Sequence, residues 1–88
     1  MDRKVAAILG VGPGLGAAVA RRFAHEGFAV AMMAREEERL GTVREEIQDA
    51  GGTALAVSAD ATDAASVASA FGQVQEKLGS PEVFVYNA

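Results

Sequence analysis

Four short apolar segments alternate with three amphipathic segments, and this alternation constrains the fold more than any other feature of the sequence. The apolar segments run from Val5 to Leu9, from Phe28 to Met33, from Thr53 to Ser58 and from Glu82 to Tyr86. Because they lack strict polar alternation, they are typical of parallel strands that are buried on both faces. We therefore predict four parallel strands.

The amphipathic segments between the strands are predicted to be helices. They run from Leu15 to Glu26, from Glu36 to Ala50 and from Asp63 to Leu78, and a glycine follows each of them closely. In the second helix we expect acidic residues in the first turn, where the helix dipole favours them. For the third helix we expect Thr62 to be the N-cap.

This βαβαβαβ order predicts a fold class, because crossovers between parallel strands are right-handed. It gives the first half of a doubly wound, Rossmann-type α/β sheet with strand order 3-2-1-4. The third helix should then cover the sheet face opposite to the first two. We expect residues 1–88 to form one partial domain, since 88 residues leave no room for a second.

Composition excludes several classes of function. The net charge of −4 argues against nonspecific nucleic-acid binding, and no cysteine and a single histidine leave nothing from which to build a metal site. That histidine, His25, is expected to be exposed rather than a proton shuttle. The apolar runs are too short for a membrane span, so we expect no membrane association and a cytoplasmic protein.

The glycine-rich segment "GVGPGLG" follows the first predicted strand and leads into the first helix. Such a loop directs backbone N–H groups at one point beside a helix N-terminus, which suits a pyrophosphate. The alternative is a purely structural turn. A P-loop is excluded because its Lys and Ser/Thr are missing. The candidate cofactor-binding residues of this segment are Gly10, Gly12, Gly14, Leu15 and Gly16.

The exit of the second predicted strand, Ala34-Arg35, bears on which dinucleotide binds. An acidic residue there would accept hydrogen bonds from the ribose of NAD, whereas a basic residue pairs with the 2′-phosphate of NADP. We therefore expect NADP rather than NAD. The alternative is that Arg35 is merely solvated, or forms an ion pair with one of the three glutamates that follow it.

Together these segments resemble the amino-terminal part of the short-chain dehydrogenase/reductase family over nearly the whole chain. "GVGPGLG" is similar to the family's T-G-x-x-x-G-x-G loop, "AREEERL" to its second-strand exit, "ADATDAASV" to its third-strand exit and "VYNA" to its N-N-A-G motif. The resemblance implies an oxidoreductase that transfers hydride between NADP(H) and a carbonyl or alcohol substrate.

The resemblance also implies roles for individual residues. Gly10, Gly14 and Gly16 would line the pyrophosphate, and Arg35 would meet the adenosine ribose or its phosphate. The remaining candidates are Asp60 and the backbone of Ala61 at the adenine, and Asn87 and Ala88 beside the cofactor. The alternative for Asp60 is a local role in the turn with Thr62 and Asp63.

Two residues depart from the family pattern. Leu9 stands where the family has threonine, and Tyr86 replaces the first Asn of N-N-A-G. We interpret Tyr86 as a strand residue, because aromatic residues favour strands. The catalytic Tyr, Lys and Ser of the family belong to later segments, so we assign no catalytic residue and expect these 88 residues alone to be inactive.

A different class of function is a noncatalytic Rossmann module that associates with itself. In this fold the third helix covers only part of its sheet face and the edge of the fourth strand is unpaired, and pairing between copies would bury both. The expected partners are therefore a dinucleotide, a small carbonyl or alcohol substrate in the full-length protein, and further copies in a homo-oligomer.

Overall fold

Seven secondary-structure elements alternate in the part of the chain that the structure describes, as predicted. The computed structural model describes residues 4–10, 15–36, 38 and 40–86. The elements are β1 (Val5–Leu9), α1 (Leu15–His25), β2 (Ala29–Ala34), α2 (Leu40–Asp49), β3 (Thr53–Ser58), α3 (Ala64–Lys77) and β4 (Val83–Tyr86). The strands form one parallel sheet in the order β3-β2-β1-β4, which confirms the predicted topology.

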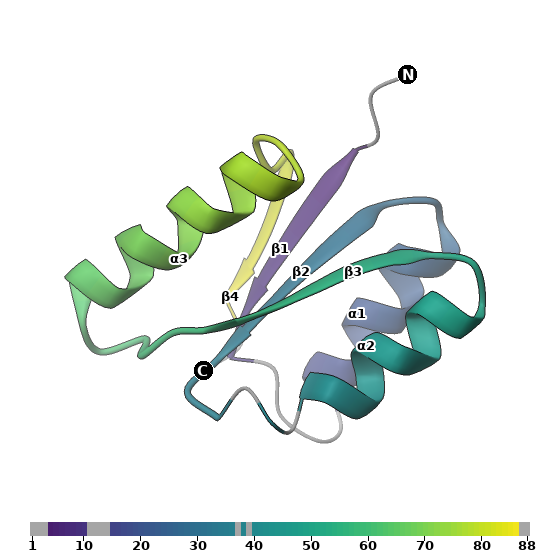
Figure 1. The fold of residues 1–88 in the computed structure, drawn as a ribbon, viewed down its shortest axis with the longest axis horizontal. Helices are drawn as coiled ribbons and strands as arrows, with labels where there is room; N and C mark the ends of the chain where they lie inside the picture. Colours follow the sequence, from purple (N-terminus) through teal and green to yellow (C-terminus); the bar gives the residue numbers. More distant parts are fainter. Residues whose placement is uncertain (1–3, 11–14, 37, 39, 87–88) are drawn as a thin grey trace.

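The helices form two layers on opposite faces of the sheet, α1 and α2 on one face and α3 on the other (Figure 1). A hydrophobic cluster lies between the sheet and each of these layers. Ile8 and Met32 face α1 and α2, whereas Leu9 and Met33 face α3, and all four side chains are almost fully buried. Burial on both faces explains why the central strands read as continuous apolar runs.

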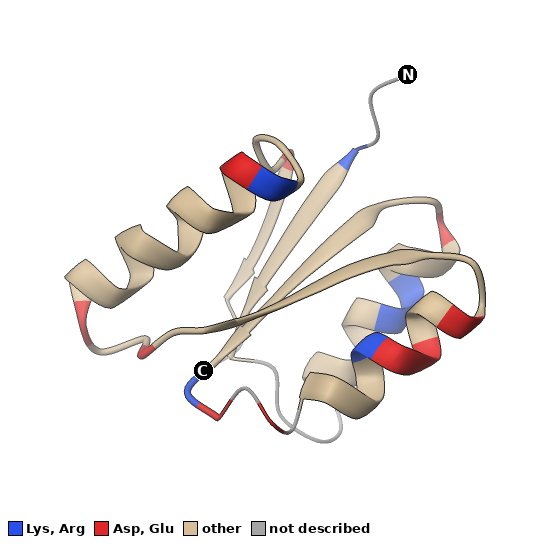
Figure 2. Ribbon diagram, in the orientation of Figure 1, with Lys and Arg blue, Asp and Glu red and all other residues tan. Residues whose placement is uncertain are grey.

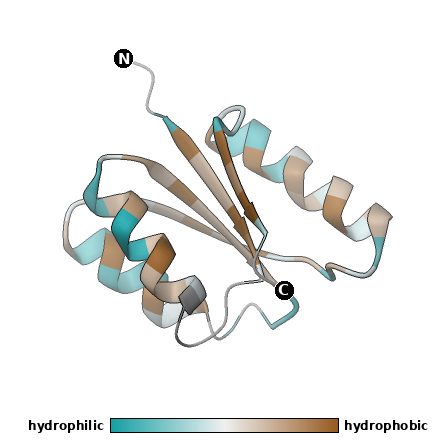
Figure 3. Cartoon of the chain, turned by 180° about the vertical axis from the view of Figure 1, so that it is seen from behind, coloured by the Kyte–Doolittle hydropathy of each residue, from teal (hydrophilic) through white to brown (hydrophobic). Residues whose placement is uncertain are grey.

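The charged residues that the structure describes lie outside the strands. None of the four strands contains a charged residue, and the ribbon of the sheet carries neither colour of charge along its strands (Figure 2). Apolar positions follow the strands, while hydrophilic positions lie on the helices (Figure 3). Burial of an unpaired charge is strongly unfavourable, whereas burial of apolar side chains is favourable. This distribution therefore stabilises the sheet.

The inner face of α1 is made of small residues. Ala17 and Ala20 are buried, whereas the larger Val19 and Phe23 are only partly buried at the margin of the cluster. Small side chains let the helix lie close to the sheet. By contrast, α2 buries the larger Leu40, Val43 and Ile47, as its periodicity predicts.

No helix in the described part of the chain has both the length and the apolar character needed to cross a membrane.

Two helix starts differ from the predictions. The second helix begins at Leu40 rather than Glu36, so no acidic residue lies in its first turn. Among the described residues of this segment, Leu40 is the first that is buried against the sheet, and packing therefore decides the start. The N-cap of α3 is Asp63 and not Thr62, because the Asp63 carboxylate accepts from the N–H groups of Ala65 and Ser66.

The fourth strand lies at the edge of the sheet and is the least buried. Phe84 and Tyr86 are 50% and 61% exposed on the face that carries α3. Phe84 contacts Phe71 of α3 edge to face, with ring centroids 5.1 Å apart. Two large hydrophobic side chains thus remain exposed to solvent beside α3.

The connection from α2 to β3 supplies a test of the packing. We expect Gly52→Ala to destabilise the fold by about 1–3 kcal/mol, as overpacking does. The added Cβ would lie 2.8 Å from Cγ2 and 3.1 Å from the carbonyl oxygen of buried Ile47. Urea unfolding followed by circular dichroism measures the change.

A matched control is Gly72→Ala on α3, where an added Cβ meets no atom within 4 Å. This variant should gain about 0.5–1 kcal/mol, because alanine has the higher helix propensity. Equal stabilities of the two variants would contradict the described packing.

Candidate functional site

The carboxyl ends of β1, β2 and β3 meet at one edge of the sheet. Backbone hydrogen bonds continue the pairing past the strand ends: the N–H of Gly10 donates to the carbonyl of Met33 at 2.8 Å, and that of Ala59 to Ala34 at 2.9 Å. The residues that follow each strand therefore lie side by side. In open parallel sheets this edge is where ligands bind.

Gly10 lies at the exit of β1 with φ of 90°. Residues other than glycine rarely adopt this conformation, so the turn that leads away from the strand requires glycine at this position. Beyond the loop, α1 begins at Leu15, and Gly16 is buried in its first turn. The chain thus passes from a strand end to a helix N-terminus, as a phosphate-binding loop must. Gly12 and Gly14 lie outside the described residues.

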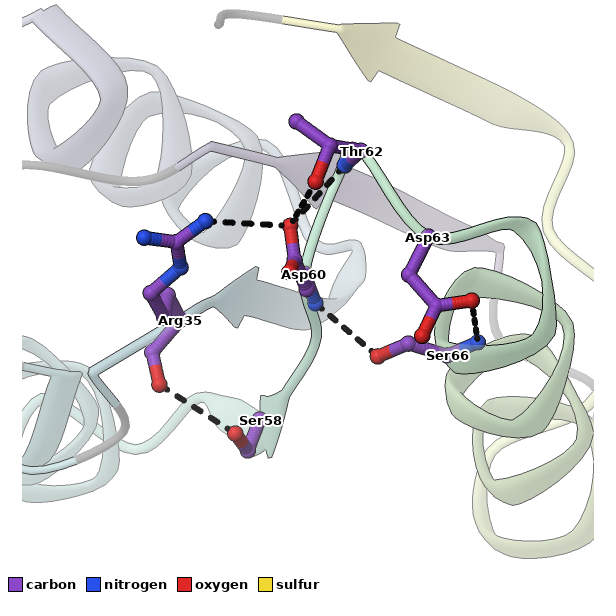
Figure 4. A network of polar contacts seen from close by, with 6 residues as sticks. All are labelled: Arg35, Ser58, Asp60, Thr62, Asp63 and Ser66. Atoms are coloured by element: carbon purple, nitrogen blue, oxygen red, sulfur yellow. Dashed lines mark hydrogen bonds and ion pairs between the residues drawn. The ribbon is translucent and has the colours of Figure 1, made fainter.

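Arg35 and Asp60 form an ion pair across the ends of β2 and β3 (Figure 4). Nη2 of Arg35 donates to Oδ1 of Asp60 at 3.3 Å, and the two side chains are 72% and 37% exposed. The structure therefore brings together the residues predicted for the ribose phosphate and for the adenine. Ala61 follows directly and is partly buried.

Asp60 is held in place by its own loop. Oδ1 accepts from the N–H of Thr62 at 2.9 Å and from its hydroxyl at 2.7 Å, while the Asp60 N–H donates to Oγ of Ser66 at 2.9 Å. Both the local role considered for Asp60 and the proximity to Arg35 are thus present in one structure.

These contacts lower the pKa of Asp60 to about 2 from its ordinary value near 3.8. The main causes are the hydrogen bonds from the hydroxyl and then the N–H of Thr62, and the bond and charge of Arg35 add to them. Hydrogen bonds to a carboxylate favour its charged form. Asp60 is therefore a permanent anion at neutral pH.

A groove of about 620 Å³ lies on the α2 side of Arg35. Its residues are Arg35, Glu36, Glu38, Gly41, Arg44, Ala56 and Ser58. The hydroxyl of Ser58 donates to the carbonyl oxygen of Arg35 at 3.2 Å and so joins the backbones of the two strand exits. Arg35 thus lines this groove and also contacts the Asp60 loop.

Three polar residues of this network were not predicted as parts of the site: Ser58, Thr62 and Ser66. The spacing of Asp60 and Thr62 is that of an Asx-turn, so the sequence held a signal for Thr62. Ser66 reaches the Asp60 backbone from the first turn of α3, and this contact was not predicted. The contact of Ser58 depends on strand pairing.

The last two predicted site residues, Asn87 and Ala88, lie outside the described residues. His25 is exposed, as predicted, and borders a separate cavity of about 480 Å³ at the amino ends of β2 and β3. Within the described ranges no three acidic or histidine side chains gather in a way that could hold a metal ion.

The chemistry of the site is that of binding. A guanidinium, a fixed carboxylate and a helix N-terminus offer charge and hydrogen bonds to a polar ligand with an anionic group. The depressed pKa of Asp60 makes it unsuited to proton transfer near neutral pH, because a general acid or base works best with a pKa near the operating pH.

The low pKa of Asp60 gives a prediction for Thr62→Val. Loss of the hydroxyl should raise the pKa of Asp60 toward its ordinary value, because the hydroxyl is the largest single cause of the shift. Carboxyl carbon chemical shifts recorded from pH 1.5 to 6 measure the change. Ser58→Ala, whose hydroxyl does not contact the carboxylate, is the control.

The same shift predicts acid sensitivity. Since the folded-state pKa is depressed, the stabilisation from Asp60 is present above about pH 4 and is lost as the pH falls toward about 2. Thr62→Val should weaken the pH dependence of stability in this window. An unchanged pKa in Thr62→Val would contradict the described hydrogen bonds.

Comparison with known proteins agrees with this architecture. The family model for short chain dehydrogenases matches residues 4–88. An oxidoreductase of Caenorhabditis elegans is 41% identical over 90 residues, covering 100% of this chain and 29% of its own length. A 3beta-hydroxysteroid dehydrogenase of Mediterraneibacter gnavus is 37% identical over 87 residues, covering 99% of this chain and 32% of its own length.

Solved structures show the same fold. A metagenomic short-chain oxidoreductase in complex with NADP has a TM-score of 0.92 and 34% identity, over 100% of this chain and 40% of its own. A mutant of actinorhodin polyketide ketoreductase with NADPH has a TM-score of 0.91 and 33% identity, over 100% of this chain and 35% of its own. The chain thus spans well under half the length of these relatives. It belongs to the short-chain dehydrogenase/reductase family.

Proposed function

We propose that residues 1–88 form the dinucleotide-binding part of an NADP-dependent oxidoreductase. The observation that carries this proposal is Arg35, a 72% exposed guanidinium at the carboxyl end of β2, where Ala34 stands in place of an acidic residue. In this fold an acidic side chain at that position holds the ribose of NAD, and a basic one accommodates the 2′-phosphate. We therefore favour NADP(H) over NAD(H).

The residues of the site fit such a cofactor. The contact with Asp60 uses Nη2 of Arg35, and a guanidinium carries further donors on Nε and Nη1. Charged hydrogen bonds of this kind to phosphate are worth about 1.5–3 kcal/mol. The left-handed turn at Gly10 and the helix start at Leu15 fit the pyrophosphate.

We assign the cofactor contacts as follows. Backbone groups of the glycine loop hold the pyrophosphate, Arg35 the 2′-phosphate, and Asp60 with Ala61 the adenine, while Asn87 and Ala88 lie beside the cofactor. The loop residues are Gly10, Gly12, Gly14, Leu15 and Gly16. When bound, the nicotinamide exchanges hydride with a carbonyl or alcohol. This chain's own part is to bind and orient, and we assign it no catalytic residue.

Two relatives support the cofactor assignment: one solved structure is a complex with NADP and another contains NADPH. Both are about one third identical to this chain and share its fold over its whole length. The cytoplasmic location belongs to the same proposal and rests on the sequence argument alone.

Arg35→Ala tests the proposal. We expect about a tenfold or greater loss of affinity for adenosine 2′,5′-bisphosphate and little change for ADP, since only the former carries the 2′-phosphate. Isothermal titration of the 88-residue chain measures both ligands. These probes lack the nicotinamide and therefore test the adenosine half alone.

Arg22→Ala is the matched control for charge. Arg22 lies in the last turn of α1, where it pairs with Glu26, at the other end of the sheet. Its loss should leave the preference between the two probes unchanged. Equal effects of both substitutions, or no preference in the wild type, would reject NADP as the cofactor.

A second candidate function is self-association through β4. It is favoured by the exposed Phe84 and Tyr86 and by the position of β4 at the sheet edge. Sedimentation velocity over a hundredfold range of concentration should then show a dimer that Tyr86→Ser weakens. A monomer at every concentration would reject this candidate.

A further inference from the structure

The Arg35–Asp60 ion pair joins two residues that the proposed function assigns to different parts of one ligand. We propose that Asp60 is a specificity-determining residue: its carboxylate competes with the 2′-phosphate for Arg35 and so lowers the preference for the phosphorylated dinucleotide. This inference rests on the proposed function, because it concerns the selectivity of the same site.

The side chain of Asp60 is held more firmly than that of Arg35. Oδ1 of Asp60 is fixed by the N–H and hydroxyl of Thr62 at 2.9 and 2.7 Å, and its backbone is tied to Ser66. Arg35 is 72% exposed, and its contact with Asp60 is longer, at 3.3 Å. The carboxylate therefore stays in place while the guanidinium can move. Binding of a phosphate must draw Arg35 away from Asp60 or share it.

Either outcome reduces the affinity for phosphate. If Arg35 leaves, the ion pair is lost; if it is shared, a dianionic phosphate and a carboxylate lie on the same guanidinium and repel one another. Water and salt screen this repulsion because the site is exposed. The effect on affinity should therefore be modest, about two- to fivefold at low salt.

The competition operates at every physiological pH. Thr62 and Arg35 keep the pKa of Asp60 at about 2, so protonation does not release Arg35 near neutrality. An acidic residue at the end of the second strand is the usual way to disfavour a 2′-phosphate, and position 34 is an alanine instead. Asp60 places a negative charge beside Arg35 from the next strand.

Asp60→Asn isolates the charge. An asparagine keeps an Oδ1 that accepts from Thr62, and it keeps the backbone N–H that donates to Ser66. Asp63→Asn is the matched control, because Asp63 carries the same charge three residues later and its carboxylate caps α3. Asparagine caps helices as well as aspartate does.

The experiment is isothermal titration of the 88-residue chain with adenosine 2′,5′-bisphosphate and with ADP, at 20 and 150 mM salt. Asp60→Asn should raise the affinity ratio of the two probes about two- to fivefold, and less at the higher salt. Asp63→Asn should change the ratio by less than about twofold, since long-range charge is screened. In an Arg35→Ala background, Asp60→Asn should have the same small effect as Asp63→Asn.

Each contrary result has a distinct meaning. A lower ratio in Asp60→Asn would show that Asp60 positions Arg35 for the phosphate, and an unchanged ratio would show no competition; both overturn this inference alone. An equal rise in Asp63→Asn would reduce the effect to net charge and also overturn it. If the folded wild type binds neither probe, the proposed function falls with it, and circular dichroism of each variant verifies folding.

Discussion

The parallel pairing of β1 with β2 and β4 is the constraint on which the rest of the structure depends. The two central strands contain no charged residue and are buried on both faces, so helices must cover each side. Each helix returns the chain to the same end of the sheet. The connections that follow the strands then gather at one edge, and there the backbone places Gly10, Arg35 and Asp60 side by side.

The strand-and-helix order was predictable because burial leaves a direct pattern in the sequence. The bounds of β1 and β3 and the sheet order agree with the prediction. The predicted start of α2 was wrong. Glutamates favour the first turn of a helix but do not fix where the helix begins, and the burial of Leu40 against the sheet decides its start. The predicted N-cap of α3 was wrong because adjacent Thr62 and Asp63 are both residue types that cap helices, and it is the Asp63 carboxylate that accepts from the N–H groups of the first turn.

The positions of Arg35 and Asp60 were predictable from the sequence, but their contacts were not. The position of Arg35 after one strand and of Asp60 after the next follows from the order of elements. Their ion pair does not, because its partners are 25 residues apart and only the strand register brings them together. From the sequence alone, the ion-pair partners considered for Arg35 were the three glutamates that directly follow it. The turn of Asp60 with Thr62 was considered from their spacing, whereas the contact with Ser66 was not predicted.

The register between β2 and β3 has a consequence for how the site forms during folding. The bonds among Asp60, Thr62 and Ser66 all lie within one short segment and can form as soon as α3 begins. The Arg35 contact instead needs Ala34 paired with Ser58, and a slip of one residue would turn every side chain of β3 to the other face. The contacts of Asp60 with Thr62 and Ser66 thus depend on one short segment, while the contact with Arg35 depends on the correct alignment of β2 and β3.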